Sequence, residues 1–217
     1  MKRYLINILL GTIAVVSSCK KDEKYVYQIG DPKIELKSDV SAAHFGDSLE
    51  FDVRVSDSEV ALSTLKAQLY FTDDKVAETT IRTKENGDYS GKIYVPFLKD
   101  IPDGKATIKF VLQNISQKKA EQSFDIALSR PDFPYLTLVT ESKSYRMEKT
   151  GRNQYAAKEN FSAEVKGYIQ APKVGEQGNV MSFGWVNNAV DFGSTAEIPF
   201  SNSTSGVYPI HFNTLTY

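Results

Sequence analysis

Apolar and polar residues alternate with a period of two through most of the chain. The clearest case is the stretch 48–56, where every second residue from Leu49 to Val55 is apolar and the residues between them are charged. Such alternation turns one face of a strand toward a core and the other toward water. Helical spacing of apolar residues is hard to find. The pattern therefore predicts an all-β protein.

The first region, 31–129, reads as a series of short strands separated by turn signals such as Asn86-Gly87 and Pro102-Asp103-Gly104. About seven short strands in about 100 residues indicate an immunoglobulin-like or fibronectin-type β-sandwich. The cysteine pair and core tryptophan of antibody domains are missing from this region, so we expect a disulfide-free relative. The expected strands are 33–37, 48–56, 61–71, 76–83, 89–97, 105–113 and 119–128.

A second β-rich domain is expected over 135–217. The connection 129–134 carries Pro131 and Pro134, which restrict the backbone and predict a stiff, extended linker. The second region is rich in Gly, Asn and Ser, including a glycine loop at 175–178, and long loops on a rigid sheet often carry binding sites. The expected strands are 135–140, 144–147, 154–157, 163–171, 179–186, 196–200 and 207–216, with a hairpin across 150–153.

The end of the sequence lies inside the last of these expected strands, at Leu215-Thr216-Tyr217. This position predicts that the chain is either naturally short or truncated. In the second case the second domain would be incomplete and would lack a strand.

The beginning of the chain is typical of a secretory leader. Lys2 and Arg3 precede a mostly apolar stretch, 4–16, and small residues follow just before Cys19, the only cysteine. An apolar stretch this short does not span a bilayer, which takes about 20 residues in a helix, but it suits a cleaved signal. The alternatives are an ordinary signal with Cys19 as a stray thiol, or an uncleaved anchor.

A signal that stops at a cysteine resembles the lipobox of bacterial lipoproteins. The resemblance implies that residues 1–18 are removed and that Cys19 is acylated, which would attach the chain to a membrane. Residues 19–30 would then form a tether. Within it Lys21-Asp22-Glu23 resembles the signal that sends lipoproteins of Bacteroidetes to the outer face of the outer membrane. The alternative is that this tract is a polar spacer and carries no sorting signal.

Composition narrows the range of functions. Of the 217 residues 41% are hydrophobic, enough for packed cores. One cysteine excludes an internal disulfide. Once residues 1–18 are removed, 24 basic and 27 acidic residues remain, a net charge of about −3. Because the short tether holds the only run of basic residues left, we expect no nucleic-acid partner.

The sequence offers little catalytic chemistry, and we expect no catalytic residue, no metal and no cofactor. His44, in an expected loop, and His211, in an expected strand, have no metal ligands at zinc spacing. A Gly-x-Ser-x-Gly elbow is missing, and the glycine loop lacks the Lys-Ser/Thr of a phosphate loop. Carboxylates are numerous, so a glycosidase pair stays open. Most of them alternate with apolar residues, as solvated strand faces do.

The sole tryptophan suggests a binding platform. Sugar C–H groups stack on aromatic faces, and neighbouring amides bind hydroxyl groups. The alternative, which we favour, is that Trp185 and Phe183 lie on one strand face and fill the second core, since Trp is highly buried on average. The candidate platform consists of Trp185, Tyr168, Asn187, Asn188 and Tyr208.

The leader, the Lys-Asp-Glu tract and the tandem β-domains together resemble the glycan-binding lipoproteins of SusE/SusF type in Bacteroidetes. The resemblance implies a non-catalytic protein anchored to the outer membrane and exposed at the cell surface. It would bind or present a polysaccharide for uptake, beside an outer-membrane transporter complex. Two alternatives remain: an adhesion or pilus-type protein that pairs through sheet edges, and a glycan hydrolase accessory module.

Overall fold

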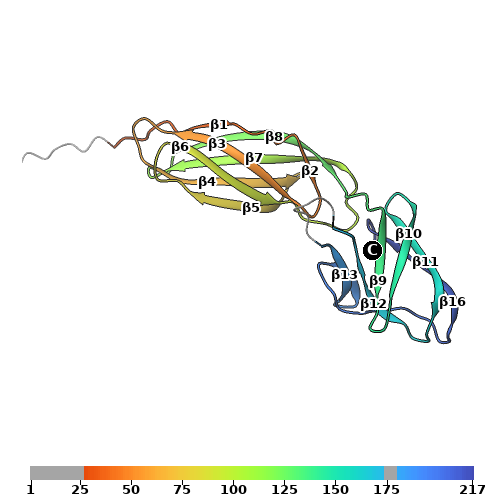
Figure 1. The fold of residues 1–217 in the computed structure, drawn as a ribbon. Coiled ribbons are helices and arrows are strands. Elements are labelled where there is room, and N and C mark those ends of the chain that lie inside the picture. The colour runs from red at the N-terminus through yellow and green to blue at the C-terminus, as the bar shows by residue number, and fades with distance from the viewer. Residues whose placement is uncertain (1–26, 174–179) are drawn as a thin grey trace, which may run out of the picture.

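The computed structural model describes residues 27–173 and 180–217, and within these ranges the chain forms strands and no helix. Figure 1 shows an elongated first domain joined to a shorter second domain. The predicted all-β class with a β-sandwich followed by a second β-rich domain is confirmed. The leader, Cys19, most of the tether and the glycine loop 175–178 lie outside the described residues.

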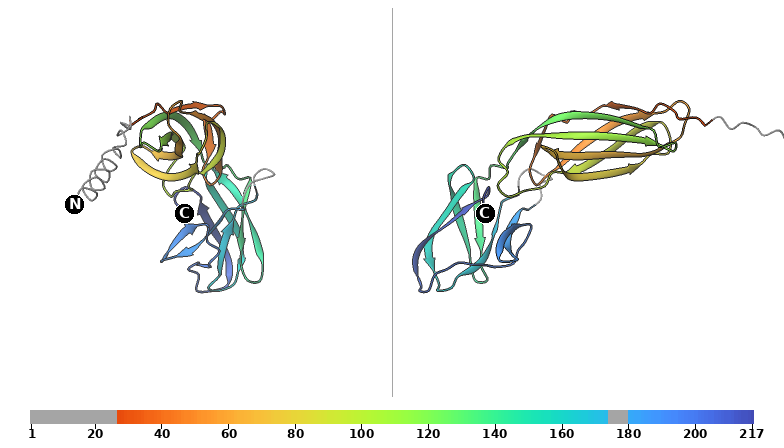
Figure 2. Two further views of the ribbon diagram at one scale, coloured as in Figure 1. Left: turned by 90° about the vertical axis from the view of Figure 1, so that its left-hand side faces the viewer. Right: turned by 180° about the vertical axis from the view of Figure 1, so that it is seen from behind.

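The first domain is a sandwich of two sheets. One sheet has the strand order β1-β3-β6 and the other the order β2-β8-β7-β4-β5. The view along the domain in Figure 2 shows the strands curling around a common core. The strands are β1 (Lys33–Leu36), β2 (Ala42–His44), β3 (Ser48–Ser56), β4 (Leu62–Phe71), β5 (Asp74–Arg82), β6 (Gly87–Tyr94), β7 (Gly104–Asn114) and β8 (Lys119–Ser129).

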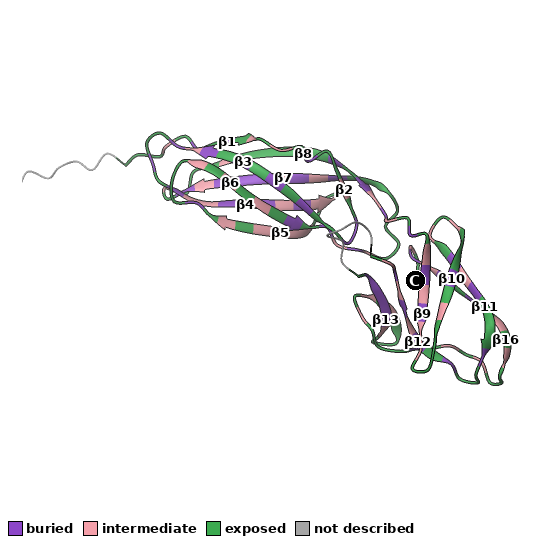
Figure 3. Ribbon diagram, in the orientation of Figure 1, coloured by how far each residue is buried: buried purple, intermediate pink, exposed green. Residues whose placement is uncertain are grey.

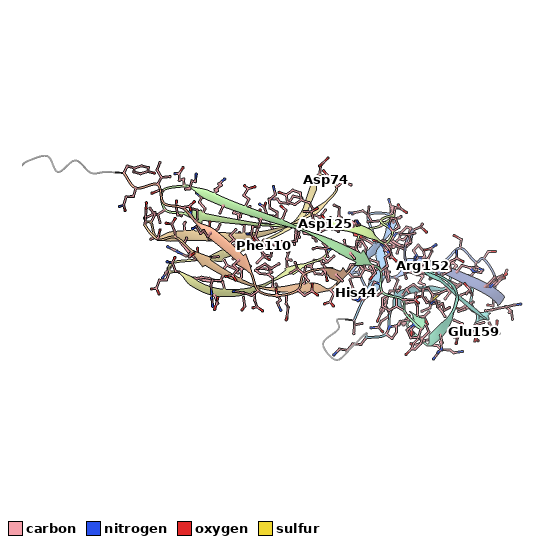
Figure 4. All side chains as sticks on the ribbon, turned by 90° about the horizontal axis from the view of Figure 1, so that it is seen from above. His44, Asp74, Phe110, Asp125, Arg152 and Glu159 are labelled. Carbon is pink, nitrogen blue, oxygen red and sulfur yellow. The ribbon has the colours of Figure 1, made fainter. Side chains whose placement is uncertain are left out.

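Alternation along each strand builds this core, as the purple and green bands of Figure 3 show. On β3 the side chains of Phe51 and Val53 are almost wholly buried, while their neighbours Asp52 and Arg54 are exposed. Phe110 of β7, labelled in Figure 4, packs edge to face on Phe51 with 5.1 Å between ring centroids. Each such ring contributes about 1.5–3 kcal/mol by leaving water.

One strand of this domain was not expected from the sequence. We predicted a loop at His44, but His44 ends β2, which pairs in parallel with β8 through Ala42–Ala127 and His44–Ser129. A strand of three residues is too short to show a period of two, so the sequence gives no signal for it. All seven strands that we predicted for this domain are confirmed, and their ends differ from the predicted ones by a few residues.

The second domain is one curved sheet with the strand order β14-β13-β12-β9-β10-β11-β16, and β15 also pairs with β12. The sheet rolls so far that Phe183 of β13 and Phe212 of β16 meet with their ring centroids 5.1 Å apart. The strands are β9 (Tyr135–Val139), β10 (Ser144–Gly151), β11 (Gln154–Phe161), β12 (Lys166–Gln170), β13 (Ser182–Val186), β14 (Ala189–Phe192), β15 (Ile198–Pro199) and β16 (Gly206–Asn213).

Two features of this domain differ from the expectation. Strand β14 was not predicted, because the hairpin that precedes it turns on Asn187-Asn188, a weaker turn signal than Asn-Gly. The last strand, predicted over 207–216, ends at Asn213. The backbone then turns, with the N–H of Tyr217 donating to the carbonyl of Asn213 at 2.8 Å. This turn directs the Tyr217 ring toward the first domain.

The junction between the domains is packed. We expected an extended linker at 129–134, but Arg130 and Phe133 in it are buried. Phe97 of the first domain stacks on Phe192 of the second, with centroids 4.6 Å apart and planes at 13°. Phe97 also lies 5.6 Å from the ring of Phe183. The cores of the two domains therefore form one continuous cluster.

Arg130 connects the two domains through hydrogen bonds of its side chain. Its guanidinium group donates to the carbonyl oxygens of Leu98 and Ile101 at 2.8 and 2.7 Å, and to that of Thr214 in the second domain. It also lies 4.2 Å from the centroid of the Phe97 ring. Burial lowers the pKa of Arg130 from its usual value, but a guanidinium keeps its charge at any ordinary pH. At the surface beside it, Arg152 pairs with Asp103 across the same junction.

Candidate functional site

A hollow of the second domain lies where the two ends of its rolled sheet approach without joining. Two adjoining pockets of about 480 and 410 Å³ lie between β16 and the segment that contains β15. They share Phe200 and His211, and we call them together the seam groove. Besides these two residues, its lining includes Gln154, Ile198, Asn202, Tyr208, Phe212, Asn213 and Tyr217.

Pairing between β11 and β16 sets one wall of the seam groove. Tyr208 lies opposite Glu159 and Phe212 opposite Tyr155 in this antiparallel pair. Tyr208, Ile210 and Phe212 share one face of β16, because alternate residues of a strand point the same way. Figure 4 labels Glu159, which lies in the part of the second domain away from the first domain. The Tyr208 end of the groove is therefore remote from the junction.

The opposite wall is fixed by hydrogen bonds. The side-chain oxygen of Asn202 accepts from the backbone N–H of Val165 at 3.0 Å, and its amide nitrogen donates to the carbonyl of Ser162. Thr204 and Tyr208 share a hydrogen bond of 2.7 Å between their hydroxyl groups. These contacts hold the loop and the Tyr208 ring in place, so the groove is formed in advance of any ligand.

The seam groove lacks carboxylate, ammonium and guanidinium side chains in its described lining, which contains one imidazole, that of His211. Burial, aided by the charge of Asp132, raises the pKa of Tyr155 to about 12, and burial also raises the pKa of Tyr217. Both phenols therefore stay uncharged at neutral pH. An apolar hollow with a few fixed hydroxyl and amide groups suits a neutral polar ligand.

The structure separates the residues of the predicted platform. Trp185 shares the face of β13 that carries Phe183, and it packs against the core half-buried, in agreement with the alternative interpretation. Tyr168 alternates with the buried Ile169 on β12 and so faces the other side of the sheet. Trp185 and Tyr168 therefore cannot stack on one ligand.

The two asparagines of the platform form a turn. Asn187 and Asn188 have φ of 49° and 65° and connect β13 to β14, which is the backbone that a two-residue hairpin needs. Of the five predicted site residues, Tyr208 alone is found in the lining of the seam groove. Sequence reasoning did not select Phe200 or His211. Their position at the seam follows from the roll of the sheet, which no local pattern encodes.

Other chemistry-bearing groups lie apart. His44 Nδ1 is 2.8 Å from the hydroxyl oxygen of Ser129, in a pair without a third partner at hydrogen-bond distance among the described residues. Within 27–173 and 180–217, no three His, Cys, Asp or Glu side chains gather as a metal site would need. The same ranges contain no helix of the length and apolarity needed to cross a membrane.

Most of the sheets' edge strands have features that disfavour pairing with another chain. Strands β1, β2 and β14 at three of these edges have four residues or fewer. β16 carries Pro209 in its middle, and a proline has no N–H to offer a new neighbour. β5 carries Asp74, Lys75, Glu78 and Arg82, and charges at an edge discourage association. The remaining edge strand of the first domain, β6, is longer, with eight residues and no proline.

The fold and the groove define an all-β, two-domain protein with a neutral groove in its second domain. Residues 1–121 match a family described as a domain of unknown function, DUF5016. This match covers more than half of the chain, which therefore belongs to the DUF5016 family. Residues 125–217 match a second domain of unknown function, DUF5125. The interval between the two matches falls within β8, before the structural junction. No curated protein matches the chain.

Proposed function

We propose that this chain is a non-catalytic lipoprotein of the outer cell surface whose second domain holds a neutral polysaccharide in the seam groove. The lipid on Cys19 would attach it to the outer membrane. The first domain would hold the groove away from the bilayer, near a transporter for the polysaccharide. The leader and the tract Lys21-Asp22-Glu23 support this location at the cell surface.

The observation that carries the proposal is the composition of the seam groove. Phe200 and Tyr208 are partly buried aromatic residues that line it, and the exposed part of such a ring offers an apolar face to sugar C–H groups. Asn213 and Gln154 bring amide groups that suit hydroxyl ligands. A hydrolase would need two carboxyl groups about 5–10 Å apart, and the described lining contains none. This favours binding over cleavage.

The packed junction between the domains supports polysaccharide binding by many copies at once. A groove fixed on a stalk samples a narrow zone above the membrane, so many copies act together on one long polysaccharide. Weak single sites then suffice, because a chain released by one groove is still held by others.

An affinity gel cast with neutral polysaccharides tests the proposal directly. We expect residues 20–217 to be retarded by at least one such gel, and both Tyr208→Ala and Phe200→Ala to migrate freely. The matched control is Tyr168→Ala, which removes a tyrosine of the same domain from the other face of the sheet and should leave retardation unchanged. Circular dichroism checks that all variants are folded.

Two results would contradict the proposal. One is a wild-type protein that no polysaccharide gel retards. The other is a Tyr208→Ala variant that is folded and retarded as strongly as the Tyr168→Ala control. The anchor is tested separately by mass spectrometry of protein recovered from membranes, where the first residue should be an acylated Cys19.

A further inference from the structure

The end of the first domain that is remote from the second domain carries three exposed apolar or aromatic side chains. Tyr27, Ile29 and Ile115 are 71%, 54% and 65% exposed, and we call them the tip. Tyr27 and Ile29 come from the segment where the chain enters the described part of the structure, which Figure 1 shows at the far left. Ile115 lies in the turn between β7 and β8.

Hydrogen bonds hold the two segments of the tip together. The Tyr27 hydroxyl group donates to the carbonyl of Ser116 at 3.1 Å, and the Ser116 hydroxyl group donates to the carbonyl of Gln28 at 2.7 Å. The side-chain amide of Asn114 donates to the carbonyl of Ile29 at 2.7 Å. The exposed side chains thus belong to a fixed surface. A cluster of exposed apolar side chains on a fixed surface is typical of a contact site.

Asn114 ties this surface to the domain itself. Its amide group also donates to a carboxylate oxygen of the buried Asp57 at 2.9 Å. The backbone N–H groups of Glu59 and Val60 donate to the same carboxylate. Although burial opposes ionisation, these hydrogen bonds outweigh it and hold the pKa of Asp57 below its usual value. Asp57 therefore stays charged and keeps the tip anchored at neutral pH.

We propose that the tip rests on the lipid surface to which the chain's own N-terminus is attached. This inference depends on the proposed acylation of Cys19. Tyr27 lies eight residues after Cys19, so the tip is within at most about 29 Å of the anchored residue. Tyrosine prefers the membrane interface, and residues 20–24, with three lysines against Asp22 and Glu23, carry a small net positive charge beside the anchor.

The same geometry makes a weak contact effective. Because the anchor keeps the tip near the bilayer, contact between them is an event within one molecule and needs little intrinsic affinity. Contact at the tip orients the long axis of the first domain away from the membrane, since the second domain lies at its opposite end (Figure 2). The seam groove is then presented outward.

Site-directed fluorescence on the anchored protein tests the inference. Full-length protein carrying Ile115→Cys is recovered from membranes, labelled with a thiol-reactive NBD dye and reconstituted into phosphatidylethanolamine and phosphatidylglycerol vesicles that contain nitroxide lipids. The matched control is Val207→Cys in the second domain, since Val207 is an exposed apolar residue (63%) remote from the tip. Both positions are exposed, so the changes leave the fold intact. Ile29→Cys provides a second reporter.

We expect the nitroxide lipids to cause a loss of fluorescence at positions 115 and 29 and no loss at 207. Equal quenching at 115 and 207, or none at either, would overturn the inference. Dye labelling of protein without an added cysteine shows whether the anchor itself is present. A failure of the tip contact can then be told from a failure of the proposed acylation. In that protein Cys19 should not react with the dye, because the thiol carries lipid, and a reactive Cys19 would exclude the anchor as well.

Discussion

The two domains are built from the same alternating strands but close in different ways. In the first, two separate sheets face each other and the core between them is complete, with Phe51 and Phe110 at its centre. In the second, one sheet rolls up and its end strands do not hydrogen-bond, which leaves the seam groove. The comparison shows that an open groove arises in this molecule where closure of the sheet is incomplete.

The groove also differs from the outer strand faces in charge. The outer faces of the first domain carry ion pairs such as Arg54–Asp88 and Lys66–Glu78, which keep a sheet in water. The described lining of the seam groove carries no such charge. The outer face of the second domain carries an ion pair as well, Arg146–Glu148, so the lack of such pairs is a property of the groove and not of the whole domain.

The largest expected effect is the difference in stability loss between a mutation in the core of the first domain and a mutation in the seam groove. Phe110→Ala should lower the free energy of unfolding by about 3–5 kcal/mol, because it opens a cavity among fully buried side chains. Phe200→Ala removes a partly buried ring at the edge of the core and should cost clearly less. Urea denaturation monitored by circular dichroism measures both. A loss as large for Phe200 as for Phe110 would mean that the seam belongs to the core and is not a binding surface.

The next effect concerns the joint between the domains. Arg130→Met should cost about 2–4 kcal/mol, since it leaves the carbonyl groups of Leu98, Ile101 and Thr214 without their donor inside the junction. Arg130→Lys is the control: it keeps a charge but cannot reach three carbonyls at once, so it should recover part of the loss. Scanning calorimetry should show one transition in the wild type and two in Arg130→Met. Unchanged stability would mean that the guanidinium group is not what joins the domains.

Most strands of the first domain could be predicted because their signal is local. Residues 48–56 alternate between apolar and charged positions, and β3 has these bounds in the structure. The short β2 could not be predicted, since three residues carry no period. The packed junction was also missed, because the prolines of 129–134 suggest a linker and nothing local shows that Arg130 finds three carbonyl groups 29 to 84 positions away.

The candidate site was harder to predict than the fold. The platform was chosen by residue type, and only Tyr208 of its members is found in the groove lining. Phe200 meets β16 only because the sheet rolls until its ends approach. That geometry depends on the twist accumulated over the whole sheet. A sequence pattern specifies which face of each strand is buried, but it does not specify whether the sheet closes.

A smaller effect tests the interpretation of the two asparagines as turn residues. Asn188→Ala should cost about 1 kcal/mol, because a left-handed backbone disfavours a side chain with Cβ, and asparagine tolerates it better than alanine. Asn188→Gly should be neutral within a few tenths of a kcal/mol. Thermal unfolding measures both, and polysaccharide retardation should persist in the glycine variant. Loss of retardation in Asn188→Gly at unchanged stability would instead make Asn188 a ligand-binding residue.

The smallest effect concerns a charge cluster on β4 and β5 of the first domain. Glu78 accepts hydrogen bonds from Lys75, Lys66 and Gln68, at 2.6, 2.9 and 2.8 Å, and these lower its pKa from 4.5 to about 2. Because the pKa is lower in the folded state, the ionised group stabilises the fold fully above pH 4.5, and this contribution is lost as the pH falls through about 2. The side chain is 24% exposed, so solvent screening keeps the effect small.

We therefore expect Glu78→Gln to be less stable than the wild type at neutral pH and the difference to shrink steadily below pH 4.5. Urea midpoints measured at neutral pH and at about pH 3 give this difference. The control is Glu159→Gln, an exposed carboxylate on β11 of the second domain, whose difference from the wild type should vary less between the two conditions. A pH dependence in Glu159→Gln as steep as in Glu78→Gln would show that the cluster contributes nothing specific. The hydrogen bonds around Glu78 would then have no specific consequence for stability.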